Sequence, residues 1–293
     1  MTITEDRRAV PPGVGTSTKN PAAAEAVFHE ATLRLLAPLR AMEGGVVADV
    51  GPGAGSATVA LARLVGDRGR VYAVDLDPAM LDATMAAARR AGVADQVRPI
   101  QHDLEDGPPP LPEPVDGVWS SACVHHTRDW DAAVRGLAGL LRPGGVLCLA
   151  EGGLPTRCLP WDAGVGRPGL EVRLDEAHNR WFTEWFAARP GARRTRHWGE
   201  IMADAGLVDV TSHNALVDVP APVPDDVRAV VLDELAARVG RATGFLDADD
   251  AAAWARLLDP ADPAWLGRRT DLVLLTARTA HWGRSPARMT PQG

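Results

Sequence analysis

Glycines and carboxylates follow short apolar runs in the first half of the chain, and these residue types together could hold an adenosine-like ligand. Glycines let a ligand approach the backbone closely. Asp75 could accept hydrogen bonds from both hydroxyls of a ribose, and Asp103 suits the exocyclic amine of an adenine. Each feature also has a structural alternative. The glycines could form only a tight turn, and Asp75 could cap a helix before Pro78. Asp103 could be a solvated loop carboxylate, and a buried Asp49 could hold the turn in place. The set comprises Gly51, Gly53, Gly55, Asp49, Asp75 and Asp103.

Two adjacent histidines follow the apolar run at Asp116–Ala122 and could supply a catalytic base. An imidazole titrates near neutral pH, so His125 or His126 could take the proton from a hydroxyl acceptor. A neutral amine or an electron-rich ring carbon can attack before any proton leaves, and then positioning suffices. The alternative is that both rings shape the loop and bond to its backbone.

An aromatic stripe is expected on a helix at Leu170–Ala188, because its members recur at helical spacing. Such a face either packs into the core or covers a bulky acceptor as a lid. The stripe consists of His178, Trp181, Phe182 and Trp185. The candidate substrate-binding residues are His178, Trp181 and Trp185, and Trp161 and Trp198 could add to the same wall. A short basic cluster nearby fits a solvated surface better than an anion site; it consists of Arg193, Arg194 and Arg196.

Alternating strands and helices must position these residues. The alternation predicts a parallel sheet with right-handed crossovers. Ligands of such sheets bind outside the carboxyl ends of the strands, where the glycine turn, the acidic residues, the histidine pair and Glu151 all fall. The expected strands are Val46–Val50, Val71–Leu76, Val97–His102, Asp116–Ala122, Val146–Ala150, Leu207–His213 and Leu272–Thr279. Gly152–Gly169 is expected to be a loop, and residues 281–293 a frayed tail.

Five short segments of the chain together resemble the motifs of class I S-adenosylmethionine-dependent methyltransferases. Val47–Gly55 resembles motif I, and Val71–Asp77 the acidic motif that follows it. Asp103-Leu104 resembles the adenine-side motif. Ser120–His126 and Leu141–Gly145 resemble the motifs at the fourth strand and before the fifth. The match covers roughly half the chain and indicates the small-molecule type, natural-product or UbiE-like.

The resemblance implies an α/β, Rossmann-like sheet of seven mostly parallel strands, with helices on both faces, an antiparallel last strand and helical lid insertions. It implies S-adenosyl-L-methionine as the cofactor. The implied cofactor-binding residues are Asp49, Gly51, Gly53, Gly55, Asp75, Leu76, Asp103, Leu104 and Ser120. A sulfonium cation tolerates carboxylates that would repel a pyrophosphate, which fits this acidic set.

The expected organisation has five parts. Residues 1–20 form a flexible arm, 21–152 the cofactor-binding half of the core, and 153–206 the lid and helix region. Residues 207–280 hold the last two strands with a helical insertion, and 281–293 the tail. The segment between the last two strands is longer than the hairpin of minimal family members, which bears on substrate class rather than on the cofactor.

The composition of the chain bears on which kinds of partner the protein can bind. The formal net charge is −7 at pH 7, which disfavours a chain that binds nucleic acid by electrostatics alone. No apolar run of about 18 residues is present, so no membrane span is expected, and the charged N-terminus does not match a signal peptide. Three scattered cysteines favour a reducing cytoplasm and no zinc site. No metal is expected, and the protein is expected to be a monomer or homodimer.

The sequence thus predicts methyl transfer from S-adenosylmethionine to a small-molecule acceptor, such as a natural product or other secondary metabolite. Two alternatives stay open. One is an NAD-dependent oxidoreductase on a similar sheet, although G-x-G-x-G is not the dinucleotide spacing. The other is a protein of the same fold that uses the cofactor without turning it over.

Overall fold

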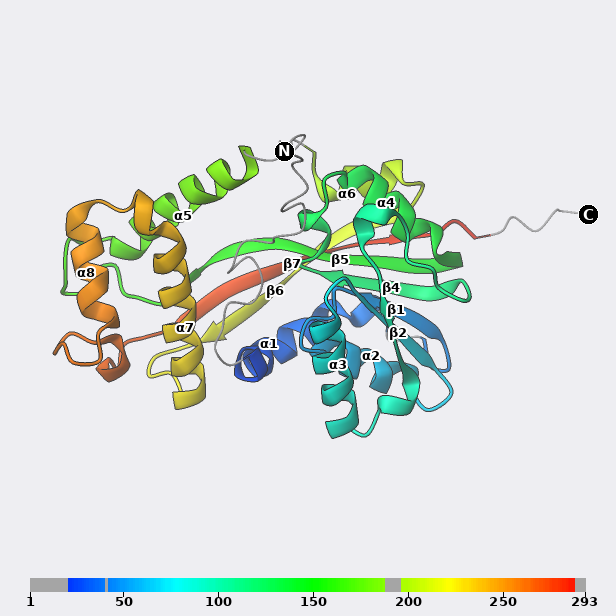
Figure 1. Ribbon diagram of the computed structural model, residues 1–293, viewed down its shortest axis with the longest axis horizontal. Helices are drawn as coiled ribbons and strands as arrows, with labels where there is room; N and C mark the ends of the chain where they lie inside the picture. Colours follow the sequence, from blue (N-terminus) through cyan, green and yellow to red (C-terminus); the bar gives the residue numbers. More distant parts are fainter. Residues whose placement is uncertain (1–20, 40–41, 188–195, 288–293) are drawn as a thin grey trace, which may run out of the picture. The chain divides into compact units, whose positions relative to one another are not determined.

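A seven-stranded sheet is present in the computed structural model, which describes residues 21–39, 42–187 and 196–287. The strands lie in the order β3-β2-β1-β4-β5-β7-β6 (Figure 1). Their bounds are β1 Val46–Val50, β2 Arg70–Asp75, β3 Val97–Gln101, β4 Val115–Ser121, β5 Leu141–Arg157, β6 Val208–Val219 and β7 Leu274–Arg284. The predicted Rossmann-like class is confirmed.

Strand directions also follow the prediction. β1 pairs in parallel with β2 and β4, β2 with β3, and β4 with β5. The backbone N–H of Gly144 donates to the carbonyl of Ser285 at 3.0 Å, and that of Ser285 to the carbonyl of Gly145 at 2.8 Å. Further along β5, a Cβ on Gly153 would lie 2.1 Å from the carbonyl oxygen of Ala277. Residue numbers therefore run in opposite directions along β5 and β7, and the last strand is antiparallel.

Parallel register brings the carboxyl ends of the strands to one edge of the sheet. Val50 at the end of β1 lies opposite Val74 of β2 and Ser120 of β4. Ser121 lies opposite Ala150 of β5. The loops that leave β1, β2 and β4 consequently begin at the same edge, which β5 passes at Ala150.

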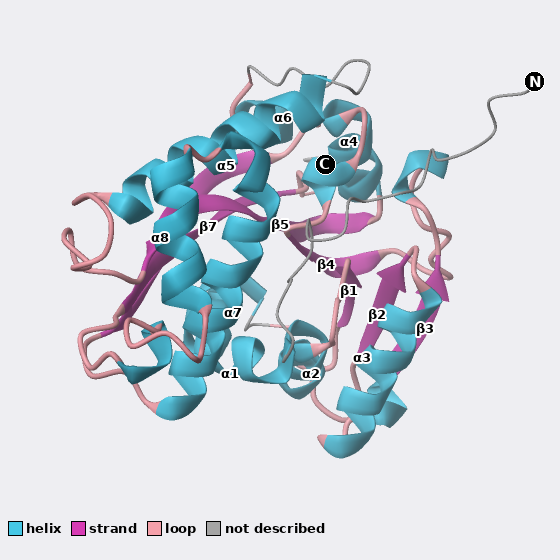
Figure 2. Ribbon diagram, turned by 60° about the vertical axis from the view of Figure 1, so that its left-hand side comes forward, coloured by secondary structure: helices cyan, strands magenta, loops and turns pink. Residues whose placement is uncertain are grey.

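Helices cover both faces of the first strands, with α2 and α3 on one side and α4 and α6 on the other (Figures 1 and 2). Ala48 and Val50 of β1 pack in one cluster with Val134 of α4 and Ile201 of α6. The residue between them, Asp49, points to the opposite face. The helix bounds in this part are α2 Ser56–Val65, α3 Pro78–Arg90, α4 Trp130–Gly139 and α6 Trp198–Asp204, and α1 spans Pro21–Leu35.

Capping residues explain where two of these helices begin. The Asp77 carboxylate accepts from the backbone N–H of Ala79 at 2.8 Å, and Pro78 occupies the first helical position of α3. Asp129 accepts from the N–H of Ala132 at 2.9 Å before α4. The short 3₁₀ turns are η1 Ala37–Leu39, η2 Ala94–Gln96, η3 Leu104–Asp106, η4 Val124–His126, η5 Thr243–Phe245 and η6 Leu266–Arg268.

The chain divides into two compact units. One comprises residues 28–154, 193–216 and 277–293, and contains the glycine turn and the histidine pair. The other comprises residues 1–27, 155–192 and 217–276. It contains helices α5 Leu170–Ala187, α7 Asp225–Ala242 and α8 Ala248–Leu258.

Two expectations about loops are wrong. β5 continues to Arg157, whereas a loop was expected from Gly152. A Cβ built on Gly153 would lie 2.1 Å from the carbonyl oxygen of Ala277, so this glycine permits a close approach of β7 rather than a turn. β7 likewise continues to Arg284 within the expected tail. Residues 1–20, Arg193 and Arg194 lie outside the described residues.

Candidate active site

The glycine turn between β1 and α2 uses its three glycines in different ways. All three have positive φ: 77° at Gly51, 56° at Gly53 and 93° at Gly55. A Cβ on Gly51 would lie 2.6 Å from Cβ of Cys123, and one on Gly55 would lie 2.7 Å from Cα of Thr84. A Cβ on Gly53 would meet nothing within 4 Å. Two glycines thus permit packing, and Gly53 borders open space that a ligand could occupy.

Asp49 and Ser120 lie beneath this turn with fully buried side chains. The Thr58 hydroxyl donates to Oδ2 of Asp49 at 2.6 Å, which ties β1 to α2. The Ser120 hydroxyl donates to the carbonyl of Val50 at 2.9 Å, which ties β4 to β1. Both contacts hold the turn in place, and the assignment of these two side chains to the cofactor stays a prediction.

Asp75, at the end of β2, faces the same turn. Its Oδ1 accepts from the backbone N–H of Asp77 at 2.9 Å. Burial raises the pKa of Asp75, against the lowering effect of the N–H groups of Asp77, Leu76 and Gly53. A desolvated carboxylate beside the Gly53 backbone is a strong acceptor for added hydroxyl donors, as the ribose prediction requires.

Three further predicted cofactor residues follow β2 and β3. Leu76 leaves 38% of its surface exposed, although it is apolar, so it offers a wall for a flat ring. The Gln101 amide donates to the carbonyl of Leu76 at 3.2 Å and joins the ends of the two strands. Asp103 accepts from the N–H of Glu105 at 2.9 Å and caps η3, which begins at Leu104. Their contact with the adenine stays a prediction.

The histidine pair lies in η4, where a buried carboxylate from β5 holds it. Glu151 is 3% exposed, and its Oε1 accepts from the backbone N–H groups of Cys123 at 3.0 Å and Val124 at 2.9 Å, with that of His125 at 3.4 Å. Oε2 lies 2.7 Å from Nδ1 of His125. The ring of His126 lies 4.0 Å from that of His125, centroid to centroid.

The chain reaches η4 through a strained residue. Ala122 has φ 49°, in the left-handed region that non-glycine residues rarely adopt. Its N–H still donates to the carbonyl of Ala150 at 3.0 Å, so the turn begins directly at the sheet. This conformation turns the next three N–H groups toward Glu151.

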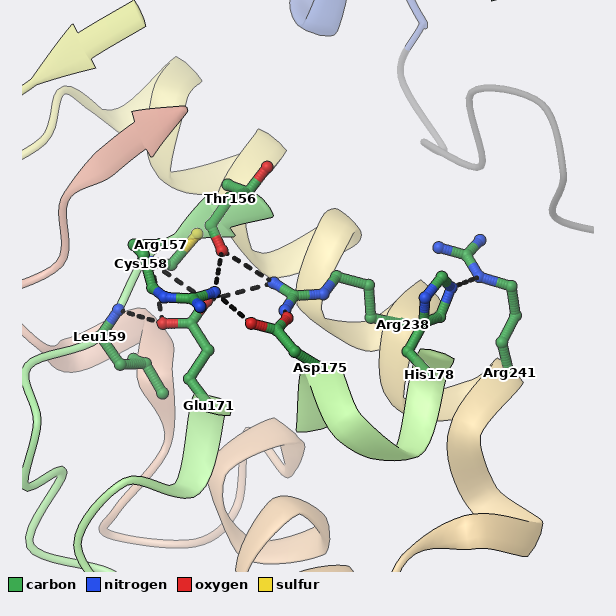
Figure 3. A network of polar contacts seen from close by, with 9 residues as sticks. All are labelled: Thr156, Arg157, Cys158, Leu159, Glu171, Asp175, His178, Arg238 and Arg241. Atoms are coloured by element: carbon green, nitrogen blue, oxygen red, sulfur yellow. Dashed lines mark hydrogen bonds and ion pairs between the residues drawn. The ribbon is translucent and has the colours of Figure 1, made fainter. Parts of the chain in front are cut away.

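The predicted aromatic face exists on α5 in the other unit. The rings of His178 and Trp181 lie 5.2 Å apart, and those of Trp181 and Trp185 stack at 6.5 Å. All three side chains are partly exposed. Nε of Arg241 on α7 donates to Nε2 of His178 at 3.1 Å (Figure 3), and its guanidinium lies 5.9 Å from the centre of Trp181.

His178 stays neutral in this setting. Burial lowers its pKa to about 4, and the cationic side chains of Arg241 and Arg238 add to the effect. Because Arg241 Nε donates to Nε2, the proton of the ring lies on Nδ1. This half-buried face combines aromatic rings with a guanidinium.

A buried ionic network fixes α5 to α7 (Figure 3). Nη1 of Arg238 lies 3.1 Å from Oε1 of Glu171, and Nη2 contacts Asp175. The Glu171 carboxylate also accepts from the backbone N–H groups of Cys158 and Leu159 at 3.0 Å. The network therefore fixes the register of the helix that carries the aromatic face.

Three other candidates lie in different surroundings: Trp161 and Trp198, which were considered as additions to the aromatic wall, and Arg196 of the basic cluster. The ring of Trp198 on α6 stacks on that of Trp130 on α4 at 4.2 Å, centroid to centroid. Trp198 therefore packs within the unit that contains the glycine turn. Trp161 is 69% exposed. Arg196 forms ion pairs with Asp131 and Asp204, as expected of a solvated surface.

The family model described as "Methyltransferase domain" matches residues 47–145, from β1 to the start of β5. Residues 47–145 therefore form a methyltransferase domain. The ubiquinone/menaquinone biosynthesis C-methyltransferase UbiE of Vibrio campbellii is 33% identical over 111 residues, which are 38% of this chain and 42% of the relative. The UbiE protein of Pseudomonas putida is 29% identical over 178 residues, 58% of this chain and 68% of the relative.

The chain therefore spans less than half the length of the Vibrio relative. Two solved structures show the same fold. A putative methyltransferase from Bacillus halodurans has a TM-score of 0.52 at 17% identity, over 88% of this chain and all of that one. A putative sarcosine dimethylglycine methyltransferase from Galdieria sulphuraria has a TM-score of 0.50 at 17% identity, over 90% and 87%.

S-adenosylmethionine is the cofactor of the methyltransferase domain, and two observed features fit it. Open space borders Gly53, where a side chain would otherwise fill the cradle. A desolvated Asp75 lies beside the same backbone and suits ribose hydroxyls. The domain therefore offers a place for the nucleoside half of the cofactor.

Sequence reasoning placed Glu151 at the correct edge of the sheet but gave it no role. Its partner His125 is 26 positions away, so spacing alone carries no signal of the pair. Arg238 and Arg241 were not singled out, since their partners on α5 are 63 to 67 positions away. Among the described residues, no cluster suits a metal ion, and no helix is long and apolar enough to cross a bilayer.

Proposed function

We propose that the protein transfers the methyl group of S-adenosylmethionine to a small-molecule acceptor. The observation that carries the proposal is the glycine turn, which sets the open backbone at Gly53 beside the desolvated carboxylate of Asp75. Both lie at the sheet edge that also carries His125. The names of the relatives, which refer to ubiquinone and menaquinone biosynthesis, support a small-molecule acceptor.

Each predicted residue then has a task. The cofactor supplies an activated methyl group. Asp75 binds the ribose hydroxyls, Gly53 gives the nucleoside access to the backbone, and Leu76, Asp103 and Leu104 surround the adenine. Methyl transfer is an in-line displacement, so the protein contributes mainly by holding the two partners close and excluding water.

Calorimetry tests the cofactor site. The purified protein should bind S-adenosylmethionine or S-adenosylhomocysteine and should not bind NAD. Asp75→Ala removes charge-assisted hydrogen bonds worth about 1.5–3 kcal/mol, so affinity should fall at least about tenfold. Asp95→Ala is the matched control, because Asp95 is an exposed carboxylate in η2, at the amino end of β3. Binding of NAD alone, or equal affinities of the two variants, would refute the assignment.

Turnover separates catalysis from a passive use of the cofactor. Incubation with methyl-labelled S-adenosylmethionine and a host metabolite extract should yield S-adenosylhomocysteine and a labelled small molecule by mass spectrometry. Binding without turnover would favour the non-catalytic alternative. We further propose that the acceptor is a natural product or other secondary metabolite, and that the protein acts in the cytoplasm as a monomer or homodimer, without nucleic acid or a membrane.

The aromatic face of α5 is our candidate for acceptor contact. If Trp181 and Trp185 touch the acceptor, Trp181→Ala or Trp185→Ala should raise the acceptor KM and leave cofactor affinity nearly unchanged. If the rings are packing residues only, each change should cost about 3–5 kcal/mol of stability instead. A melting curve beside the kinetics distinguishes the two results.

A further inference from the structure

The buried carboxylate of Glu151 is unusual because it serves a loop rather than the core. Its side chain is 2% exposed, yet it contacts four donors: three consecutive backbone N–H groups of the β4–η4 connection and one imidazole ring. A buried carboxylate is costly unless such donors surround it. The donor set thus fixes both the carboxylate and the loop.

The contact with His125 selects one form of its ring. An ionised carboxylate can only accept hydrogen bonds, so the proton of the neutral ring lies on Nδ1, 2.7 Å from Oε2. Nε2 is then the proton acceptor. The His125 side chain is 24% exposed whereas that of Glu151 is 2% exposed, so a ligand can reach the ring but not the carboxylate.

Among the described residues, His281 is a titratable neighbour of Glu151, and it does not compete with His125 as a cation. His281 on β7 is 3% exposed, and its Nδ1 lies 2.7 Å from the hydroxyl of Ser212. Burial lowers the pKa of His281, and the nearby ring of His197 lowers it further. Its neutral ring leaves the Glu151 charge available to an imidazolium on His125.

We infer that Glu151 is a positioning residue that makes His125, rather than His126, the catalytic base, and that the acceptor is a hydroxyl compound. This inference rests on the proposed function. It assigns Glu151 two tasks, holding the Nδ1–H form of the ring and stabilising the positive charge that forms on it. A base held in this way has a purpose only for an acceptor that must lose a proton.

In the step itself, the O–H bond of the acceptor breaks and its proton moves to Nε2 of His125. The same oxygen forms the new bond to the methyl carbon, and the electron pair of the broken S–C bond stays on sulfur. The positive charge thus passes from the sulfonium to the imidazole next to Glu151.

The first test needs no acceptor. In the ¹⁵N-histidine-labelled protein bound to S-adenosylhomocysteine, the His125 ring should show its proton on Nδ1, with His125→Gln assigning the signals. In Glu151→Gln, the amide N–H donates to Nδ1, and the proton should move to Nε2. Glu105→Gln is the matched control and should leave the ring unchanged, because Glu105 accepts from the backbone N–H of Arg128 on the same loop. A proton on Nε2 of the native protein would overturn the inference.

The second test uses ¹³C-methyl cofactor with the metabolite extract. The product should carry an O-bound methyl group, and Glu151→Gln and His125→Gln should each lower kcat about 100-fold or more with cofactor affinity unchanged. A C-bound methyl, as the name of the Vibrio relative suggests for that protein, or an N-bound methyl would overturn the acceptor class. A loss in His126→Gln instead would overturn the choice of base. Absence of any product would count against the proposed function, while the NMR result would still decide the role of Glu151.

Discussion

Replacing Arg238 by methionine should strongly destabilise the unit that contains α5 and α7. Arg238 is 5% exposed, and it is the α7 partner of two carboxylates on α5, Glu171 and Asp175. Methionine keeps much of the aliphatic length but removes the charge. The buried Glu171 carboxylate then loses its cation, and removal of one member of a buried pair typically costs about 3–5 kcal/mol.

The remaining contacts place the expected loss near the lower end of that range. Glu171 keeps its two backbone donors, the N–H groups of Cys158 and Leu159. Asp175 keeps its ion pair with Arg157. We therefore expect about 3 kcal/mol for Arg238→Met. Adding Glu171→Gln removes the uncompensated charge, so the double variant should recover about 1–2 kcal/mol.

Urea unfolding, followed by both circular dichroism and tryptophan fluorescence, measures these differences. Arg256→Met is the matched control, since Arg256 pairs with Asp262 on the exposed side of α8 and should matter little. Equal losses in Arg238→Met and Arg256→Met would refute the account of the buried network. No recovery in the double variant would show that the cost comes from packing rather than charge.

Two further predictions concern the glycine turn and His178. Gly55→Ala should lower the melting temperature more than Gly53→Ala, because a Cβ at Gly55 meets the backbone of Thr84 at 2.7 Å whereas one at Gly53 meets nothing within 4 Å. Gly53→Ala should instead weaken cofactor binding, which calorimetry would measure. The folded-state pKa of His178, about 4, lies below its ordinary value of 6.5, so the unfolded chain binds the proton more readily. Stability should therefore fall as pH drops from about 6.5 toward 4, and His178→Gln should reduce that fall in melting experiments.

Local patterns predicted where the glycine turn and Asp75 lie in the sheet, because each of these features is local. A buried strand that ends in a glycine turn, or in a carboxylate before Pro78, fixes its own position at the sheet edge. The pairing of Glu151 with His125 is different, since it depends on β4 and β5 being neighbours and on the left-handed turn at Ala122. Spacing along the chain contains neither fact.

The errors at the ends of β5 and β7 have a physical reason. Gly152, Gly153 and Pro155 are typical of a loop, but the glycine at 153 is required by the close approach of another strand. The buried His281 lies in a segment that looked like a tail because its partner Ser212 is 69 positions away. Long-range pairing overrides local turn preference in both segments.

The left-handed backbone at Ala122 restricts which sequences this position can accept. If a library randomised the codon and were selected for catalysis, glycine, asparagine and aspartate should be recovered beside alanine, because they tolerate φ near 49°. Valine, isoleucine and threonine should be depleted, since a branched Cβ is strained there. The exposed position of the side chain would suggest free variation, so a strong bias at residue 122 would come from backbone geometry alone.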